Sequence, residues 1–300
     1  MFVLAHLSDP HLAPLPAARW RELASKRILG FLDWTYHRGA IHRADVVKTI
    51  VEDLKSQSPN HIAVTGDLVN IALVREFANA RNWLERLGGA HDVTLVPGNH
   101  DAYVRSVASE PARFWGDYMR ADNDQASGGE PFPFVRRRGD IAVIGLSTAV
   151  ATPWLMATGR LGVTQTNRCA EILARLADEG LYRIVLIHHP PAGHRVAIRR
   201  LTDAEVFRRV LRECGAELVL HGHDHTASLD WLEGPSGRIP VVGVPSASAR
   251  SNGHNIPAAY NLYHIDRGAG DSWTCEVVSR GFRNGGSAVV ELGRHMLATN

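Results

Sequence analysis

Clusters of Asp, Asn and His recur along this 300-residue chain, and side chains of these types bind divalent metal ions. In chain order the clusters contain Asp9 and His11; Asp67; Asn99, His100 and Asp101; His188 and His189; and His221, His223 and His225. Because Asp9 and His11 are two positions apart, both side chains can turn towards one point. One such turn would be ordinary loop chemistry. Five clusters of oxygen and nitrogen donors without a thiolate favour a metal site.

An apolar run of strand length precedes each cluster, and segments with helical spacing of apolar residues separate these runs. The runs cover residues 2–7, 61–64, 92–96, 182–187 and 217–220, and the helical segments cover 42–56, 71–87, 164–178 and 202–214. Alternating strands and helices predict a mostly parallel sheet, whose strands present their carboxyl ends along one edge. We therefore expect the following donors to meet at that edge: Asp9, His11, Asp67, Asn99, His188, His223 and His225. This set suits two ions about 3.5–4 Å apart that share a carboxylate.

Residues 14–39 form an unusual segment, in which Trp20, Trp34 and other apolar residues alternate with arginines such as Arg38. The spacing predicts an amphipathic helix of a few turns that ends near Gly39. This helix can pack on the domain. Alternatively, it can act as a lid or membrane-touching helix that meets an anionic or lipidic substrate. An exposed apolar face here would also be a candidate surface for a homodimer.

The remaining patterns complete the expected organisation. A helix is predicted around residues 108–120 and a strand at 140–146, while Arg136–Arg138 is expected in a turn at a strand edge. Three strands, at 241–244, 260–265 and 273–279, follow without helices between them, so we expect them to be antiparallel. No repeat or linker is evident. We therefore expect a single domain over residues 1–300, with a helical insertion at 14–39 and a β-rich segment at 239–300.

The composition indicates a globular protein and argues against some classes of partner. Hydrophobic residues make up 45% of the chain and charged residues 21%, which is typical of a globular protein. The net charge of +2 and the lack of a long basic, aromatic-rich stretch argue against a nucleic-acid partner. Three widely spaced cysteines are expected to be reduced, and no stretch is long and apolar enough to span a membrane. Without a basic leader region, the cytoplasm is the expected location, with peripheral contact to a membrane as an option.

The ordered motifs DPH, GDLVN, GNHD, HHPP and GHDH resemble those of the calcineurin-like metallophosphoesterases. The resemblance implies a four-layer αββα sandwich with two mixed central β-sheets, and two metal ions, Mn, Fe or Zn, that supply a metal-bound hydroxide. By motif, one ion would be held by Asp9, His11 and His225, the other by Asn99, His188 and His223, with Asp67 as the bridge. His100 would contact the phosphate and assist the leaving group, and Asp101 would orient His100 or its loop. His188 is preferred to its neighbour His189 as a ligand, and His221 is expected beside the site.

Within this family, GNHD together with HHPP most resembles the class III cyclic nucleotide and glycerophosphodiester phosphodiesterases. A phosphodiesterase is therefore the expected activity. The segment after HHPP, with His194 and Arg195, is basic where that subgroup has an acidic segment. It can bind a second phosphate or an anionic head group, or be a solvated loop. An alternative is thus a lipid-linked pyrophosphate or phospholipid head-group hydrolase, similar to UDP-diacylglucosamine hydrolases or phospholipase C-like members. A phosphomonoesterase, a nuclease and an inactive scaffold are weaker alternatives.

Overall fold

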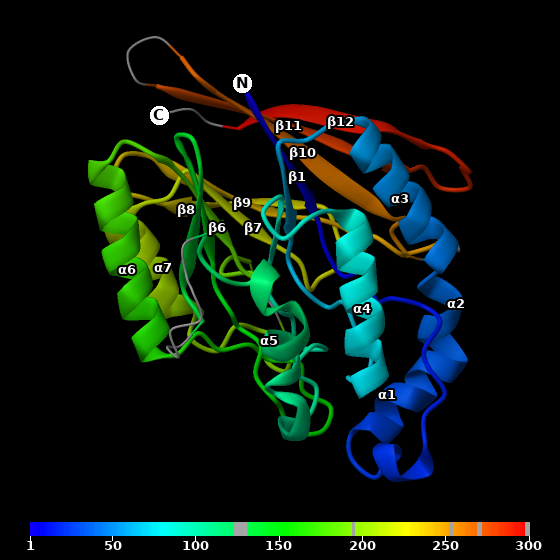
Figure 1. Ribbon diagram of the computed structural model, residues 1–300. Helices are drawn as coiled ribbons and strands as arrows, with labels where there is room; N and C mark the ends of the chain where they lie inside the picture. The colour runs from blue at the N-terminus through cyan, green and yellow to red at the C-terminus, as the bar shows by residue number, and fades with distance from the viewer. Residues whose placement is uncertain (123–130, 194–195, 252–254, 269–271, 298–300) are drawn as a thin grey trace.

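The computed structural model describes residues 1–122, 131–193, 196–251, 255–268 and 272–297. Two six-stranded sheets lie face to face, and helices cover the outer side of each sheet (Figure 1). Both sheets combine parallel and antiparallel strand pairs. The four-layer αββα sandwich expected from the motifs is confirmed.

The first sheet joins the two ends of the chain. Its strand order is β12-β11-β10-β1-β2-β3. The strands are β1 (Phe2–Leu7), β2 (His61–Val64), β3 (Val93–Leu95), β10 (Ala259–Arg267), β11 (Trp273–Phe282) and β12 (Val289–Leu297). Strands β1, β2 and β3 are parallel, whereas β10 runs antiparallel to both β1 and β11. Strand β12 lies at the end of the expected β-rich segment, where the sequence pattern predicts no individual strand.

The second sheet has the order β4-β5-β6-β7-β9-β8. Its strands are β4 (Phe134–Arg138), β5 (Ile141–Gly145), β6 (Tyr182–Leu186), β7 (Leu218–His221), β8 (Ser228–Glu233) and β9 (Arg238–Gly243). The prediction that the late strands are all antiparallel is wrong for β9, which pairs parallel to β7. The chain first forms the edge strand β8 and then turns back, so that β9 is antiparallel only to β8.

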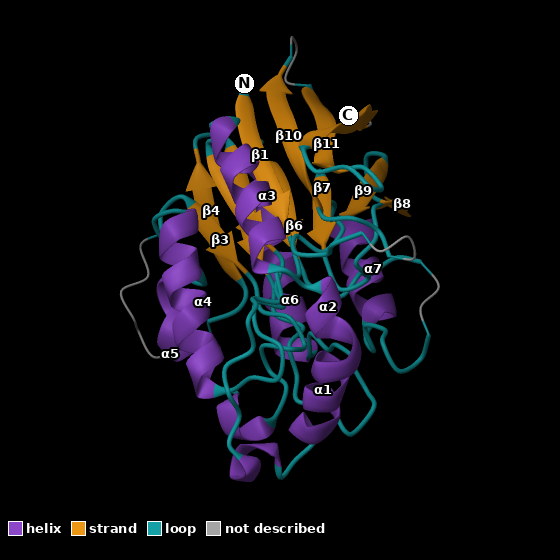
Figure 2. Ribbon diagram, turned by 90° about the vertical axis from the view of Figure 1, so that its right-hand side faces the viewer, coloured by secondary structure: helices purple, strands orange, loops and turns teal. Residues whose placement is uncertain are grey.

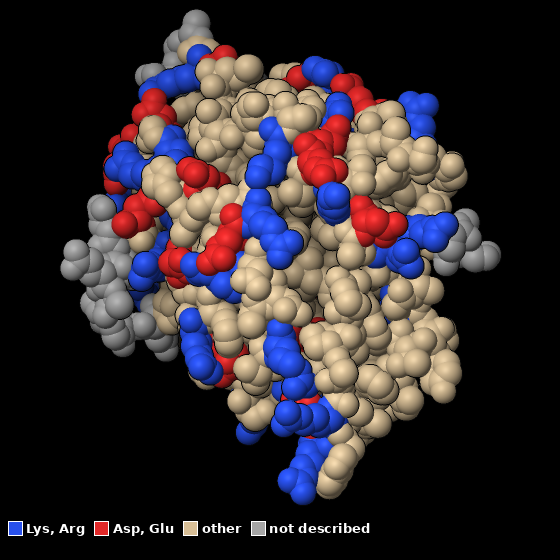
Figure 3. Space-filling model, turned by 45° about the vertical axis from the view of Figure 1, so that its right-hand side comes forward, with Lys and Arg blue, Asp and Glu red and all other residues tan. Residues whose placement is uncertain are grey.

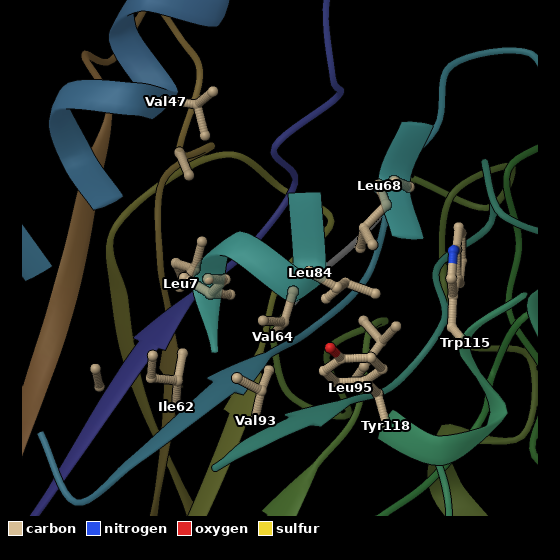
Figure 4. Packing of buried hydrophobic residues seen from close by; sticks show 14 of the residues in the cluster. Leu7, Val47, Ile62, Val64, Leu68, Leu84, Val93, Leu95, Trp115 and Tyr118 are labelled. Atoms are coloured by element: carbon tan, nitrogen blue, oxygen red, sulfur yellow. The ribbon is translucent and has the colours of Figure 1, made fainter. Parts of the chain in front are cut away.

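Strands β2, β3, β5, β6 and β7 are buried on both faces, which explains their continuous apolar runs. Leu4 and Ala63 face the second sheet, whereas Ala5 and Val64 on the same strands face the helices. Figure 4 shows this helix-side core, in which apolar side chains of β1, β2 and β3 pack with Leu84 of a covering helix. The two sheets are thus held in fixed positions, and so are the loops at their ends.

Helices cover the sandwich on both sides. They are α1 (Arg27–Asp33), α2 (Gly39–Ile41), α3 (Ala44–Ser56), α4 (Val74–Leu87), α5 (Glu110–Trp115), α6 (Val163–Asp178) and α7 (Ala204–Cys214). Helices α3 and α4 supply apolar residues to the core on the first sheet, and α6 and α7 supply those on the second. None of the described helices is long and apolar enough to cross a membrane. All three cysteines are free, as expected.

The insertion is more irregular than predicted. A 3-10 turn (Trp20–Leu23) precedes α1, and a π-helical turn (Trp34–Arg38) joins α1 to α2. The helical part therefore begins at Arg27 and extends past Gly39 to Ile41. The guanidinium of Arg27 donates hydrogen bonds to the carbonyl oxygens of Ile71 (2.9 Å) and Ala72 (2.5 Å), which anchors α1 to the loop after β2. Helices α1 and α2 extend beyond the sheets in Figure 1.

Candidate active site

The polar clusters converge where the loops after β1, β2, β3, β6 and β7 meet, on the side of the sandwich towards α1 and α2 (Figure 2). Each of the seven donors expected at this edge lies in the convergence zone, and all but His225 are buried. Asp9, Asp67 and His188 offer ligand atoms within 4.8 Å of one another, although they follow strands of both sheets. Packing of the two sheets therefore assembles the site.

Asp9, His11 and His225 form one half of the cluster. Nε2 of His225 lies 3.2 Å from Oδ1 of Asp9 and 3.2 Å from Nε2 of His11. Nε2 of His11 is 4.0 Å from the same carboxylate oxygen. These three ligand atoms face one another across a space suited to a cation.

Asn99, His188 and His223 form the other half. Oδ1 of Asn99 lies 3.2 Å from Nε2 of His188 and 2.9 Å from Nδ1 of His223. Asp67 lies between the halves, because its Oδ2 is 3.4 Å from Nε2 of His188 and 3.9 Å from Nε2 of His11. A carboxylate in this position can contribute to two neighbouring cation sites.

The backbone at several of these residues is strained. Positive φ angles occur at Asp9 (51°), His11 (36°), Asp67 (55°), His223 (72°) and His225 (55°). Non-glycine residues rarely adopt such angles, and when they do the strain is concentrated at functional sites. Here the strained turns direct successive side chains of each motif into the same space.

The loops after β2 and β3 approach each other so closely that the GNHD motif requires glycine at position 98. A Cβ atom on Gly98 would lie 2.2 Å from Oδ1 of Asp67 and 2.7 Å from Cε1 of His188. Any larger residue would therefore displace the carboxylate between the two halves or the adjacent imidazole.

The hydrogen bonds of the histidine ring nitrogens indicate whether these donors fit metal ions. Nδ1 of His188 lies 2.6 Å from the carbonyl oxygen of Thr65, and Nδ1 of His11 is 3.3 Å from that of Val69. Nε2 of His223 is 2.9 Å from the carbonyl oxygen of Arg199. We assign an N–H to each of these nitrogens, since a carbonyl oxygen can only accept. The other ring nitrogen then faces the cluster, where its lone pair can bind a cation once any proton on it has left, as in metal-binding histidines.

Charge also favours a cation between these groups. Burial lowers the pKa of His188, but the carboxylates of Asp67 and Asp9 outweigh it and raise the pKa to about 10. In the metal-free protein a proton on Nε2 therefore neutralises part of this negative charge. A metal ion can replace that proton, so the donor set fits cations.

His100 lies at the edge of the cluster. Its backbone N–H donates to Oδ1 of Asp67 (2.7 Å), and its Nδ1 lies 2.5 Å from the carbonyl oxygen of Asn70. The ring stacks on Tyr103, with centroids 5.4 Å apart. Burial and the nearby charge of Arg38 lower the pKa of His100 to about 4. The imidazole is thus neutral at pH 7 and is held in one orientation.

Asp101 contacts backbone amides, and its position favours the second of the two roles expected for it, that of orienting the loops. Its carboxylate accepts hydrogen bonds from the N–H groups of Asp67 (2.9 Å), Leu68 (3.0 Å), Val69 (3.2 Å) and Gly98 (2.8 Å). These bonds join the loop after β2 to the loop after β3. Asp101 therefore positions Asp67 and the GNHD turn relative to each other.

The neighbouring histidines differ in their contacts. Both ring nitrogens of His189 have partners outside the cluster, since Nδ1 lies 2.7 Å from Oγ1 of Thr148 and Nε2 lies 3.1 Å from the carbonyl oxygen of Ala157. His189 nevertheless lies beside His188 and His223, within reach of a shared ion. His221 is buried, and its Nδ1 lies 2.9 Å from the carbonyl oxygen of Gly222. His194 and Arg195 lie outside the described residues.

Two residues near the C-terminal end of the insertion, Arg38 within it and His42 three residues beyond it, reach the site and are absent from the expected set. Nη2 of Arg38 lies 2.9 Å from Nε2 of His11, and its Nη1 lies 3.1 Å from Nε2 of His100. His42 packs against His11 with ring centroids 4.5 Å apart, and could share an ion with His11 and His225. The four-residue spacing of Arg38 and His42, which in a continuous helix brings two side chains to one face, is the signal that could have found them.

The arrangement of the donor residues agrees with the family that the sequence matches. The sequence matches the family model described as calcineurin-like phosphoesterase over residues 2–227. The chain belongs to this family. Calcineurin-like phosphoesterases hydrolyse phosphoesters, so the cluster lies in a phosphoester hydrolase, as the motifs predicted.

Individual relatives of this phosphoesterase are distant. A Synechococcus protein named "probable cyclic nucleotide phosphodiesterase" is 23% identical over 232 residues, which are 75% of this chain and 78% of the relative. A dimetal phosphatase from Danio rerio has a TM-score of 0.60 and 13% identity, over 97% of this chain and 98% of its own. Purple acid phosphatase PPD1 from yellow lupin has a TM-score of 0.61 and 12% identity, over 93% of this chain and 51% of its own. The two structural likenesses show the shared fold.

Proposed function

We propose that this phosphoesterase is a metal-dependent phosphodiesterase with a dinuclear centre. The observation that carries the proposal is the arrangement of two sets of three donors with the carboxylate of Asp67 between them. A single ion would leave one set of three largely buried donors without a cation to bind.

Each donor has a proposed role. Asp9, His11 and His225 would hold one ion, Asn99, His188 and His223 would hold the other, and Asp67 would contribute to both. When bound, a pair of such ions stabilises negative charge on the phosphoryl oxygens and supplies a hydroxide nucleophile at neutral pH. Donors of these types suit Mn, Fe or Zn.

His100 acts on the substrate in this proposal. The carbonyl oxygen of Asn70 holds Nδ1, so that Nε2 is directed towards His11 and Arg38. A bound phosphoester adds negative charge nearby, which raises the pKa of the imidazole. His100 can then hold a proton at Nε2 and donate it to the departing oxygen. Asp101 keeps Asp67 and this loop in place.

The comparison with relatives supports a diester as substrate. The Synechococcus relative is named as a phosphodiesterase, although it is distant. Hydrolysis of either a diester or a monoester releases an alcohol, whose oxygen needs a proton that His100 at the edge of the donor cluster can supply.

A second candidate is a hydrolase of lipid-linked phosphoesters. Three segments joined to the site by hydrogen bonds expose large apolar side chains: Leu32 and Tyr36, Trp154 and Leu155, and Val196 and Ile198. In Figure 3 the lower right of the molecule is mostly free of charged side chains, whereas several Lys and Arg side chains lie at the lower tip beside it. An apolar surface beside the site suits a substrate that enters from a membrane or a micelle.

The test compares hydrolysis of bis-p-nitrophenyl phosphate with that of p-nitrophenyl phosphate, after chelation and after addition of Mn²⁺. We expect faster hydrolysis of the diester, dependence on metal, and a loss of roughly 10²-fold to 10⁴-fold in kcat for His100→Ala, with its metal content retained. Preference for the monoester would contradict the diesterase proposal. Activation by detergent or anionic liposomes would favour the lipid-linked candidate.

A further inference from the structure

We infer that Arg38 binds the phosphoryl oxygens of the substrate, which makes the helical insertion a part of the active site. This inference rests on the proposed function, because it assigns a substrate contact within the same centre. It differs from the motif-derived roles in that the residue comes from a segment outside all five motifs.

The contacts of Arg38 carry the argument. Its guanidinium makes hydrogen bonds to Nε2 of His11 (2.9 Å) and to Nε2 of His100 (3.1 Å). Among the described residues, no carboxylate forms an ion pair with it. A half-buried guanidinium that makes hydrogen bonds only to imidazoles is a cation without a direct ion-pair partner. Its position, between a proposed ligand and the proposed proton donor, is where a phosphoryl group would supply that negative charge.

The contact between Arg38 and His11 also supports a substrate-binding role for Arg38. A neutral imidazole has one lone pair, which cannot both accept a hydrogen bond from Arg38 and bind a cation. When His11 binds a cation, Nη2 of Arg38 loses this acceptor and can donate to a substrate oxygen instead. A planar guanidinium with two free N–H directions matches two oxygens of one phosphoryl group.

The insertion holds Arg38 on a supported element. Arg27 anchors α1 to the loop after β2, and the ammonium of Lys26 donates to Oγ1 of Thr152 (2.9 Å). The ring of Trp34 stacks on His42 at 6.2 Å with an interplanar angle of 10°. Arg38 is the last residue of the π-helical turn, and such turns are rare and frequently mark functional sites. The local geometry thus directs this one arginine inwards while the neighbouring Tyr36 and His37 stay exposed.

The experiment measures binding of inorganic phosphate to the Mn²⁺-loaded full chain by calorimetry, together with metal content. The variants are Arg38→Gln and Arg38→Lys. Arg21→Gln removes an exposed arginine of the same insertion and serves as the matched control. For Arg38→Gln we expect wild-type metal content and a phosphate dissociation constant raised roughly 10-fold to 100-fold, as for loss of a charge-assisted contact. Arg38→Lys should fall between this variant and wild type, and Arg21→Gln should match wild type.

Several results would overturn the inference. These are phosphate binding unchanged in Arg38→Gln, metal content reduced in a folded Arg38→Lys variant, or no phosphate binding by the loaded wild type. Failure of the proposed function has a different signature. If the wild type binds metal and phosphate but does not hydrolyse the diester, the diesterase proposal is wrong, and the phosphate titration of the variants still decides the role of Arg38.

Discussion

Nε2 of His188 lies 3.4 Å from Oδ2 of Asp67, although His188 follows a strand of the second sheet and Asp67 follows a strand of the first. An ion bound by both residues would link the two sheets directly. Because only the folded protein presents this pair together, metal binding should stabilise the fold.

We therefore expect chelation to lower the melting temperature and Mn²⁺ to restore it. Free metal at 100 times its dissociation constant contributes about 3 kcal/mol, which corresponds to roughly 5–10 °C for a chain of this size. The measurement is thermal unfolding with chelator and with added metal. The variant Asp67→Asn is the control, and its melting temperature should respond much less. Equal metal responses of the two proteins would show that the ion binds elsewhere.

His188 and His189 should differ sharply when each is replaced by alanine. His188 directs Nε2 towards Asp67 and Asn99, whereas both nitrogens of His189 have partners in Thr148 and Ala157. We expect His188→Ala to lose bound metal and at least ~10²-fold in kcat, as is usual when a metal ligand or its support is removed. His189→Ala should keep its metal and lose mainly stability. Metal analysis and diester hydrolysis check this pair, and the reverse pattern would make His189 the ligand.

Arg136 provides a prediction about stability. The sequence pattern placed it in a turn at a strand edge, which is wrong. It lies in β4 with 2% of its surface exposed, and its guanidinium donates to the carbonyl oxygens of Ala90, Val93, Asp117 and Arg120. Arg136→Met would leave these buried oxygens short of donors, at a cost of about 2–4 kcal/mol in the free energy of unfolding.

Chemical denaturation checks this value, with Arg137→Met on the same strand as the matched control. Arg137 is about half exposed and pairs with Glu179, so its replacement should cost at most ~1 kcal/mol. Similar losses for the two variants would mean that the buried hydrogen bonds of Arg136 contribute little.

The ion pair of Asp53 and Arg280 predicts a pH dependence of stability. Burial raises the pKa of Asp53, but hydrogen bonds from Arg280 and Tyr260 outweigh it and bring the pKa below its ordinary value. A lowered pKa means that the stabilisation is present above the unfolded-state pKa of about 3.9 and is lost as the pH falls through the folded-state pKa. Asp53→Asn should therefore cost about 1 kcal/mol at pH 7. The difference from wild type should shrink below about pH 4.

Denaturation curves at pH 7 and below pH 4 provide the measurement. Asp45→Asn on the same helix, whose Arg43 partner is exposed, is a control and should have a smaller effect. A difference between wild type and Asp53→Asn that grows as the pH falls would contradict the assignment.

Local features made most of the site predictable. Strands β1, β2, β3, β6 and β7 are short apolar runs followed at once by ligand-type residues, so their type follows from the sequence pattern alone, whereas their division between two sheets does not. The choice of His188 over His189 is different, because it depends on Thr148 and Ala157, which lie far away in the sequence. Contacts of this kind exist only after the sheets have packed.

Other features depend on tertiary structure in the same way. Arg38 belongs to a segment whose pattern indicates an amphipathic helix, but only the anchoring by Arg27 directs it to His11. The burial of Arg136 requires four carbonyl oxygens from two other segments. The pattern of polar and apolar residues predicts which side chains face water. It cannot show that hydrogen bonds to distant segments compensate for the burial of a charged side chain.

The central claim is that two ions bind between the sheets, and the number of metal ions per chain tests it most directly. Metal-free protein would be titrated with Mn²⁺ and with Zn²⁺, and its bound metal measured after removal of the excess. We expect two ions per chain for the wild type and one for Asn99→Ala, which loses a ligand from one half of the cluster only. A wild-type protein that binds no metal at these residues, or an Asn99→Ala variant that keeps two ions, would contradict the dinuclear centre.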